Sequence, residues 1–292
     1  MTDGSGDGDG IRAGRAQHGQ HGRPTDGDER ADPELLALYD EFMRGAPSVP
    51  PPGVAYERDG PLVRAVGGFR GFVHGPRDTG VRGAELDRLI ARQRDRFAER
   101  GETVEWRTHS HDEPPELPGR LRAAGFTPGA TMSVLVGESA ELADGPVLPE
   151  GVVLRRVEDE DDMRRVAAME ATVWHMDLSW LAGLLAARIR AAPDDVCVLV
   201  AEHEGRVVCA AWMFLWPDRR YAGLRGGTTV PEWRGRGVYR ALVAERARVA
   251  AARGVPHLQV DASADSRPVL RRLGFRTVTA VTPYVWTPPT AR

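Results

Sequence analysis

A short run of arginine and glycine has the composition of a phosphate-binding turn. The segment VPEWRGRGVYR, residues 230–240, places Arg234, Gly235, Arg236 and Gly237 between an apolar run and a helical pattern. The first N–H groups of a helix have no partners and carry partial positive charge, so they bind anions. Glycine lets a phosphate approach this backbone, and arginine forks onto phosphate oxygens. An exposed Arg/Gly loop without a ligand is the alternative interpretation.

Other chemistries are excluded or weakly encoded. The chain has no lysine and all 39 basic residues are arginine, which excludes a lysine Schiff base and a Walker-type phosphate loop. His109, His111 and Asp112 have a metal-like composition, and His18 and His21 lie in a polar N-terminal segment. We expect structural or solvated roles for these side chains and predict no metal site.

The elements around the turn alternate between strand and helix patterns. Apolar and alternating runs predict strands at 151–157, 196–203, 207–216, 221–230, 257–262 and 276–287. Helical spacing predicts helices at 159–174 and 178–192, one from the turn to Gly254, and a short one at 266–275. Glu204 and Gly205 predict a two-residue hairpin turn.

The earlier part of the chain shows a similar order. Helices are predicted at 33–44, 84–100 and 117–126, and strands within 61–75 and at 103–109 and 130–137. A helix, a strand, a short helix ending in Gly-Phe and another strand occur twice, about 150 residues apart. This repeat predicts two tandem related domains in an α/β (α+β) fold, with a mixed central sheet flanked by helices. Two unrelated α/β units that share a common Gly-Phe helix end are the alternative.

Composition divides the chain into four segments. Residues 1–32 are rich in Gly and Asp and predict a disordered tail. We predict a first domain at 33–140, a Pro-containing acidic linker at 141–150 and a second domain at 151–292.

The composition argues against a nucleic-acid or membrane partner and favours a cytoplasmic location. The net charge of −3 and a pI near 6.3 argue against a nucleic-acid partner. The chain has neither an apolar run of membrane-spanning length nor a signal-peptide core. Cys197 and Cys209 lie in apolar runs, so we expect no disulfide framework. We expect a monomer or a homodimer.

The order of elements in 151–286 resembles the GNAT-type N-acetyltransferase superfamily. The family's pyrophosphate-loop pattern, Arg/Gln-x-x-Gly-x-Gly/Ala, matches Arg234 and Gly237, with Tyr239 in place of the usual small residue and Gly235 nearby. The helix ending Leu-Gly-Phe at 273–275 is the second shared mark. The first half has no comparable phosphate loop, so the resemblance implies a tandem protein with a degenerate N-terminal copy and one working site.

The resemblance implies acetyl-CoA as the cosubstrate. Its pyrophosphate is expected on the amides of residues 234–239, which include Val238, and its pantetheine beside Thr229 and Val230. The amide of Val230 is expected to donate to the thioester carbonyl. Ser263 takes the position where relatives often carry a cofactor-binding Asn.

The proton-transfer groups are less clear than the cofactor loop. The attacking amine must be neutral, so a base has to accept its proton. Glu170, Asp177 and His175 are candidate bases, with a solvated carboxylate at a helix end or a loop histidine as the alternative for each. Where many relatives have a tyrosine acid, this chain has Leu270, and Ser266 and Tyr239 are candidate substitutes. A thiolate leaves readily without an acid.

The acceptor is the least determined part of the prediction. Trp174, Trp180, Trp212 and Trp216 are candidates to line an apolar acceptor site or to pack in the core. Arg219, Arg220 and Arg225 are candidates to bind an acceptor carboxylate, with a solvated strand end as the alternative. A small amine is the predicted acceptor, and a protein N-terminus or lysine is not excluded. A non-catalytic acyl-CoA-binding sensor or scaffold is the alternative function.

Overall fold

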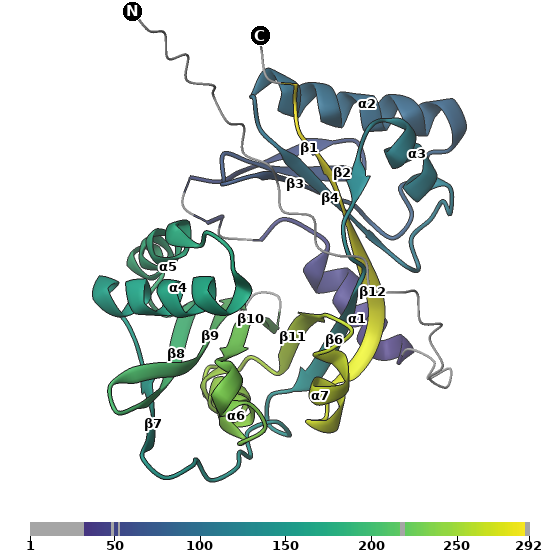
Figure 1. Ribbon diagram of the computed structural model, residues 1–292. Helices are drawn as coiled ribbons and strands as arrows, with labels where there is room; N and C mark the ends of the chain where they lie inside the picture. The colour runs from purple at the N-terminus through teal and green to yellow at the C-terminus, as the bar shows by residue number, and fades with distance from the viewer. Residues whose placement is uncertain (1–31, 48–49, 52, 217–219, 290–292) are drawn as a thin grey trace, which may run out of the picture. The chain divides into compact units, whose positions relative to one another are not determined.

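The computed structural model describes residues 32–47, 50–51, 53–216 and 220–289 (Figure 1). Residues 1–31 of the predicted tail lie outside the described residues, as do His18, His21 and Arg219.

Strands of one mixed sheet form the centre of the described chain. In chain order they are β1 Ala55–Asp59, β2 Leu62–Val66, β3 Gly71–His74, β4 Val104–His109, β5 Thr127–Pro128, β6 Met132–Glu138, β7 Val152–Arg156, β8 Val196–His203, β9 Arg206–Trp216, β10 Tyr221–Thr229, β11 His257–Ala262 and β12 Arg276–Trp286. The predicted mixed sheet is therefore confirmed.

Helices flank this sheet (Figure 1). They are α1 Pro33–Met43, α2 Gly83–Glu99, α3 Leu117–Ala123, α4 Glu160–Trp174, α5 Ser179–Ala191, α6 Val238–Ala252 and α7 Arg267–Arg272, with a short 3₁₀ turn, η2, at Pro231–Trp233. Each helix predicted from periodicity is present, within a few residues of its expected ends.

Two hairpins show what local sequence can and cannot indicate. Glu204 and Gly205 both have left-handed φ values, 49° and 76°, as the predicted two-residue turn between β8 and β9 requires. Strand β1 was not predicted, although a glycine follows it: Gly60, at φ 58°, and Pro61 form the turn that joins Asp59 of β1 to Leu62 of β2.

The predicted repeat is visible as two related parts of the sheet. Helix α2, strand β4 and helix α3 recur as α6, β11 and α7, in the same order. The final strands of the two parts are exchanged, because β6 pairs with β11 and β12 pairs with β4. Strands β6 and β12 also pair with each other, so hydrogen bonding continues from β1 through to β7.

The register of these strands follows an approximate twofold relation. Arg276 of β12 lies opposite Val136 of β6, and their equivalents in the other copy, Thr127 of β5 and Val285 of β12, also lie opposite each other. A register shift interrupts the pairing of β6 with β12 between Thr277 and Thr279. The predicted domain boundaries at 140 and 151 remain predictions, since residues 31–292 form one compact unit.

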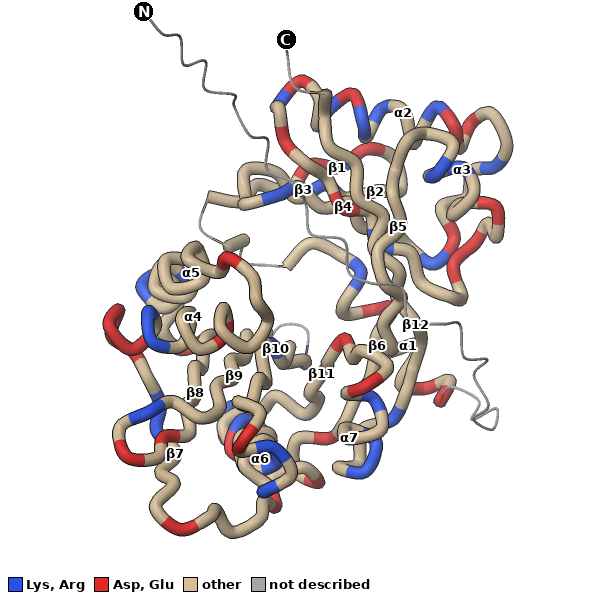
Figure 2. Tube along the Cα trace, viewed as in Figure 1, with Lys and Arg blue, Asp and Glu red and all other residues tan. Residues whose placement is uncertain are grey.

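Helices α4 and α6 contact opposite faces of strands β9 and β10. Thr228 of β10 bonds Glu170 of α4, whereas the adjacent Gly227 lies against Tyr239 of α6. The central parts of β8 and β9 carry no charged residue (Figure 2), as expected for strands covered on both sides. The site residues described below therefore lie on a rigid sheet between helical layers.

Candidate functional site

The predicted phosphate-binding turn lies between β10 and α6. Pro231 starts the η2 turn, and Gly235 and Gly237 then adopt left-handed φ values of 73° and 81°. Helix α6 begins at Val238, and no side chain caps its N-terminus. Left-handed glycines beside an uncapped helix start direct main-chain N–H groups toward one point, which is the geometry of an anion site.

Exposed arginines surround this turn. Arg234, Arg236 and Arg240 are all exposed. The Nε of Arg234 donates to the carbonyl of Thr229 at 3.1 Å, and the Arg236 guanidinium lies 4.8 Å from the ring centre of Trp233. These contacts hold two of the cations beside the turn, where they add positive charge to that of the helix start.

Tyr239, the residue that departs from the family pattern, is accommodated by a glycine. A Cβ at Gly227 would lie 2.7 Å from a ring atom of Tyr239, so the ring fits only because Gly227 has no side chain. Gly227 is also left-handed, at φ 91°, within a bulge between Gly226 and Thr228. The large ring therefore packs under β10, and burial raises the pKa of its hydroxyl.

Strands β10 and β11 separate beside the turn. They pair only from Tyr221 to Gly223, although β10 continues to Thr229. The bulge at Gly227 bends β10 at this point. Main-chain groups on the β11 side of the rest of β10 therefore have no strand partner.

The expected role of the Val230 amide is corrected by the structure. Its N–H donates to the carbonyl of Val208 at 3.0 Å, so it points toward β9 and not toward β11. Because peptide groups alternate along a strand, the main-chain groups of Thr229 point to the opposite side, where Arg234 bonds the Thr229 carbonyl. The register of β10 against β9 decides which amide of β10 points into the gap between β10 and β11. The sequence did not reveal this register.

Glu170 is buried beside the bulge and is not a solvated carboxylate at a helix end. Its side chain lies in the last turn of α4 and is only 3% exposed. Its Oε2 accepts hydrogen bonds from the Thr228 hydroxyl at 2.6 Å and from Nε1 of Trp174 at 2.9 Å. Within the described chain, its Oε1 has no partner. Burial raises the pKa of the carboxyl, and the two hydrogen bonds partly oppose this shift.

The two other candidate bases have local structural roles. Asp177 is exposed, and its Oδ1 accepts the main-chain N–H of Ser179 at 3.0 Å, which lowers its pKa. His175 ends α4 in a left-handed conformation at φ 53°. Within the described residues, neither side chain bonds the bulge of β10.

The serine candidates lie together after β11. The hydroxyls of Ser263 and Ser266 are 3.1 Å apart, and the Ser266 main-chain N–H donates to the Ser263 hydroxyl at 3.3 Å. Leu270, one turn further along α7, is buried and lies in the core. The structure thus brings the two serines together, at the end of the strand that separates from β10.

The tryptophans divide into two groups. Trp212 and Trp216 are partly buried against core clusters, while Trp174 and Trp180 are 58% and 50% exposed. Trp180 stacks on Phe69 of the β2–β3 hairpin with 5.9 Å between ring centres. An aromatic contact therefore joins α5 to the first half of the chain.

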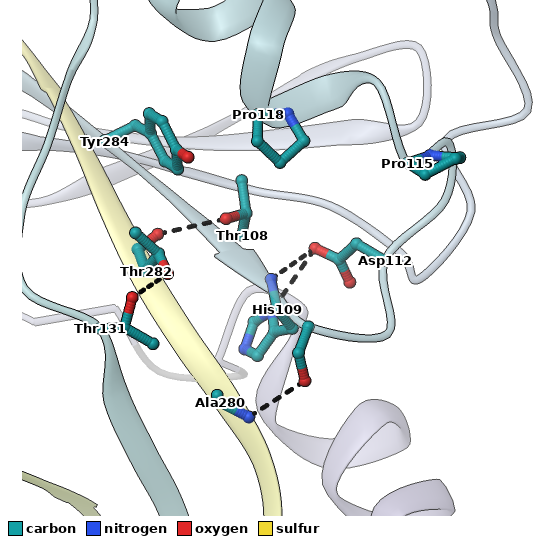
Figure 3. Close-up of a pocket in the computed structure, with 10 residues that line it drawn as sticks. Thr108, His109, Asp112, Pro115, Pro118, Thr131, Ala280, Thr282 and Tyr284 are labelled. Carbon is teal, nitrogen blue, oxygen red and sulfur yellow. Dashed lines mark hydrogen bonds and ion pairs between the residues drawn. The ribbon is translucent and has the colours of Figure 1, made fainter. Parts of the chain in front are cut away.

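His109 and Asp112 line a cavity in the first half of the chain (Figure 3), and His111 belongs to the same polar cluster. His109 bonds the Tyr39 hydroxyl at 3.0 Å, while His111 bonds the Asp40 carboxylate at 3.0 Å and Asp112 bonds Arg44 at 2.6 Å. The described residues contain no group of three or more side chains arranged to hold a metal ion.

The cavity itself has a volume of about 230 Å³. Its lining hydroxyls bond one another or the main chain, for example Thr131 to Thr282 at 2.9 Å. At the start of α2, which corresponds to the start of α6, the Asp78 carboxylate accepts from Gly80 N–H and from Arg82. These contacts lie within the loop that precedes α2.

Comparison with known families gives a match in the second half of the chain. Residues 160–275 match the family model described as the acetyltransferase (GNAT) family. No curated protein matches the sequence. Among the helices of the described ranges, none is long and apolar enough to span a membrane.

Solved structures with this fold match most of the chain. A GCN5-related N-acetyltransferase from Kribbella flavida is 20% identical, with a TM-score of 0.63, and the match covers 88% of this chain and 95% of that one. A tandem GNAT protein from the clavulanic acid biosynthesis pathway is 16% identical, with a TM-score of 0.56 and coverage of 89% and 97%. A GCN5-related N-acetyltransferase from Sphaerobacter thermophilus is 18% identical, with a TM-score of 0.56 and coverage of 80% and 83%. These likenesses show the fold.

Proposed function

We propose that this protein transfers an acetyl group from acetyl-CoA to a small amine, because residues 160–275 match the family model of the GNAT acetyltransferases. The transfer is direct, with both substrates bound together. Acetyl-CoA supplies the activated acetyl group as a thioester. The protein supplies binding, alignment of the two substrates and a base.

The cofactor site consists of the turn and the separation of the strands. The main-chain N–H groups of residues 235–239 would hold the pyrophosphate, with Arg234 and Arg236 beside it. The fit rests on two left-handed glycines and an uncapped helix start. The main chain of Thr229, and not that of Val230, would hold the acyl end, because Val230 N–H is used by β9. Ser263 lies at the end of β11, across from this strand.

Glu170 is the proposed base. Its Oε1 has no partner in the described chain, and its other oxygen is fixed by Thr228 and Trp174. A raised pKa brings a carboxylate closer to the neutral pH at which a general base works best. Glu170 would accept the proton that the amine loses when it attacks. The buried carboxylate beside the β10 bulge is the observation that favours catalysis over passive cofactor binding.

Leaving-group protonation does not depend on a tyrosine in this scheme. Leu270 is buried and carries no hydroxyl. Ser266, which directly precedes α7, has a hydroxyl that bonds the hydroxyl of Ser263. Ser266 would donate to the departing sulfur, whose low basicity makes this assistance minor. The leucine at position 270, in place of a tyrosine, favours the alternative function, a non-catalytic acyl-CoA sensor that binds the cofactor without turnover.

The test pairs two glycines at the two ends of α6. Gly235 and Gly254 have similar φ values, 73° and 71°, and a Cβ on either would meet no atom within 4 Å. Alanine at each position therefore strains the backbone equally. Gly235→Ala should weaken acetyl-CoA binding by about tenfold or more, because charge-assisted hydrogen bonds are lost, whereas Gly254→Ala should not.

Isothermal titration calorimetry measures this binding, and thiol release against an amine panel measures turnover. Absence of acetyl-CoA binding at millimolar concentration, or equal effects of the two substitutions, contradicts the proposed cofactor site. Tight binding without turnover on any amine favours the sensor.

A further inference from the structure

Arg225 lies on the same face of β10 as the proposed base. Arg225 is opposite Trp212 of β9 and Thr228 is opposite Ala210, which is two residues from Trp212. Cross-strand neighbours share a face, so Arg225 and Thr228 both face α4 and are separated by about 7 Å along the strand. Since Thr228 bonds Glu170, a cation and a carboxylate are positioned beside the same section of β10.

The Arg225 guanidinium has no anionic partner within the described ranges. Its Nη1 donates to the Leu224 carbonyl at 2.8 Å and to Oε1 of Gln259 at 3.4 Å, both neutral groups. No carboxylate oxygen of the described residues lies within 4.0 Å of a guanidinium nitrogen of Arg225, the distance that defines an ion pair. Burial lowers the pKa of this arginine, and the charge of the nearby Asp261 only partly opposes this shift. A partly buried cation without a directly bound counter-charge is costly, so the presence of Arg225 here requires an explanation.

Neighbouring carboxylates are already paired with other arginines. Asp261 accepts from Nε2 of Gln259 at 2.6 Å and from Arg107 at 3.2 Å. Glu105 accepts from Arg107 at 2.7 Å and from Arg70 at 2.8 Å. The chain of contacts from Arg225 to Arg70 therefore contains three arginines and two carboxylates, which leaves one positive charge in excess.

We propose that the acceptor amine also carries a carboxylate, and that Arg225 binds it while Glu170 faces the amine. This inference rests on the proposed acetyltransferase function. The acceptor class is a small amino acid, either an α-amino acid or one with a few carbons between its two groups. Its two opposite charges match the charges of the two side chains.

Arg225 would therefore determine specificity without taking part in the chemical step. A forked arginine bonds a carboxylate through two parallel hydrogen bonds, which a neutral amide cannot reproduce. The excess charge of the cluster also disfavours a cationic group at the Arg225 end of the site. Acceptors without an anion should bind weakly and in mixed orientations.

The experiment compares each acceptor with a neutral analogue. Thiol release from acetyl-CoA is measured for the proteinogenic amino acids, β-alanine and γ-aminobutyrate, each beside its carboxamide. The wild-type protein should favour the best acid over its amide by about 10- to 100-fold in kcat/KM, the range of a charge-assisted pair. The amine of a carboxamide is less basic than that of the matching acid, so more of it is neutral and able to react. This difference favours the carboxamide, so a preference for the acid cannot come from amine basicity.

Variants then assign the preference to Arg225. Arg225→Gln should reduce the ratio to near one, and Arg225→Lys, which keeps the charge but not the fork, should leave an intermediate ratio. Arg164→Gln removes an exposed arginine from α4 and should leave the ratio unchanged. If circular dichroism shows that Arg225→Gln does not fold, the acid-to-amide ratio of kcat/KM in Arg225→Lys is the deciding measurement. A ratio equal to that of the wild type overturns the inference.

The outcomes separate this inference from the proposed function. Turnover of amides as fast as acids, or an unchanged ratio in Arg225→Gln, overturns the carboxylate site and leaves the acetyltransferase intact. If no amine turns over, the proposed function fails, and calorimetric titration of the CoA-saturated protein with the same acids tests the site. Binding of an acid that Arg225→Gln abolishes supports it, and no binding of any acid overturns it.

Discussion

Replacing Glu170 by glutamine tests the proposed base with little change in shape. The amide oxygen of the new side chain can still accept from Thr228 and from Trp174, at the positions where Oε2 accepts now at 2.6 and 2.9 Å. The NH₂ group then takes the place of Oε1, which has no protein partner in the described structure. Glu170→Gln therefore removes the proton acceptor and keeps the local hydrogen bonds.

The expected loss follows from the role of a general base. Such a group contributes about 10²- to 10⁴-fold to the rate, so kcat for the best amine should fall by that factor. The KM for acetyl-CoA should stay within about twofold, because the cofactor turn contains no contact to Glu170. Asp177→Asn, at an exposed carboxylate that only bonds Ser179 N–H, should retain wild-type kcat.

The pH dependence gives a second, independent measurement. Burial raises the pKa of Glu170 in the folded protein above its ordinary range, so the folded state binds more protons than the unfolded state between these two values. Stability should therefore fall as pH rises through this window. In Glu170→Gln the fall should be absent, so the variant should gain stability relative to wild type as pH rises. Chemical denaturation at a series of pH values measures the difference.

The assay also defines the refuting result. Activity is measured by thiol release at saturating acetyl-CoA over a range of pH, and wild-type kcat/KM should rise with pH through the raised pKa of Glu170. If Glu170→Gln binds acetyl-CoA normally and retains kcat within about threefold, Glu170 is not the base. A water chain or the amine's own equilibrium would then have to remove the proton.

Three further outcomes follow from buried groups. Both cysteines are fully buried, and burial raises the pKa of the Cys209 thiol to about 11, so neither thiol should react with a disulfide reagent until the protein unfolds; rapid labelling of the native protein would contradict this. Trp174→Phe removes a donor that stabilises ionised Glu170, so the pH–kcat/KM profile should move to higher pH, and an unmoved or lowered profile would refute the contact's role. Arg246 is fully buried and donates to the carbonyls of Trp212 and Arg225, so Arg246→Ala should lower the free energy of unfolding by about 3 kcal/mol or more in urea titrations, whereas a change below about 1 kcal/mol would show that the pocket relaxes.

Local patterns were sufficient to predict the geometry of the turn before α6. Pro231, the two glycines at 235 and 237, and the following helical spacing act within one or two turns of chain, and the structure shows left-handed glycines at an uncapped helix start there. The repeat was also readable, since Gly125-Phe126 and Gly274-Phe275 mark the same helix end twice. Strand β1 was missed because AYERD carries few of the apolar residues on which the strand prediction relied.

The exchange of final strands was not predictable from either repeat alone. Each half has a complete set of local signals, and pairing β6 with β11 instead of β4 satisfies the same apolar pattern. The strand that pairs with β6 is selected only when the two halves of the sheet come together. The predicted boundary at 140 separates β6 from the second half of the chain, whose strands pair with β6. This boundary remains a prediction about evolutionary units.

The sequence by itself determined the kinds of residues at the site and the short-range geometry of the turn, because φ preferences and helix starts depend on near neighbours. Tertiary structure alone decided that Glu170 is buried against Thr228, that the Val230 amide points to β9 and that Arg225 shares a face of β10 with Thr228. These outcomes depend on strand register and on the bulge at Gly227, which join residues tens of positions apart. A shift of one residue in that register would turn Thr228 and Arg225 to the other face of the sheet.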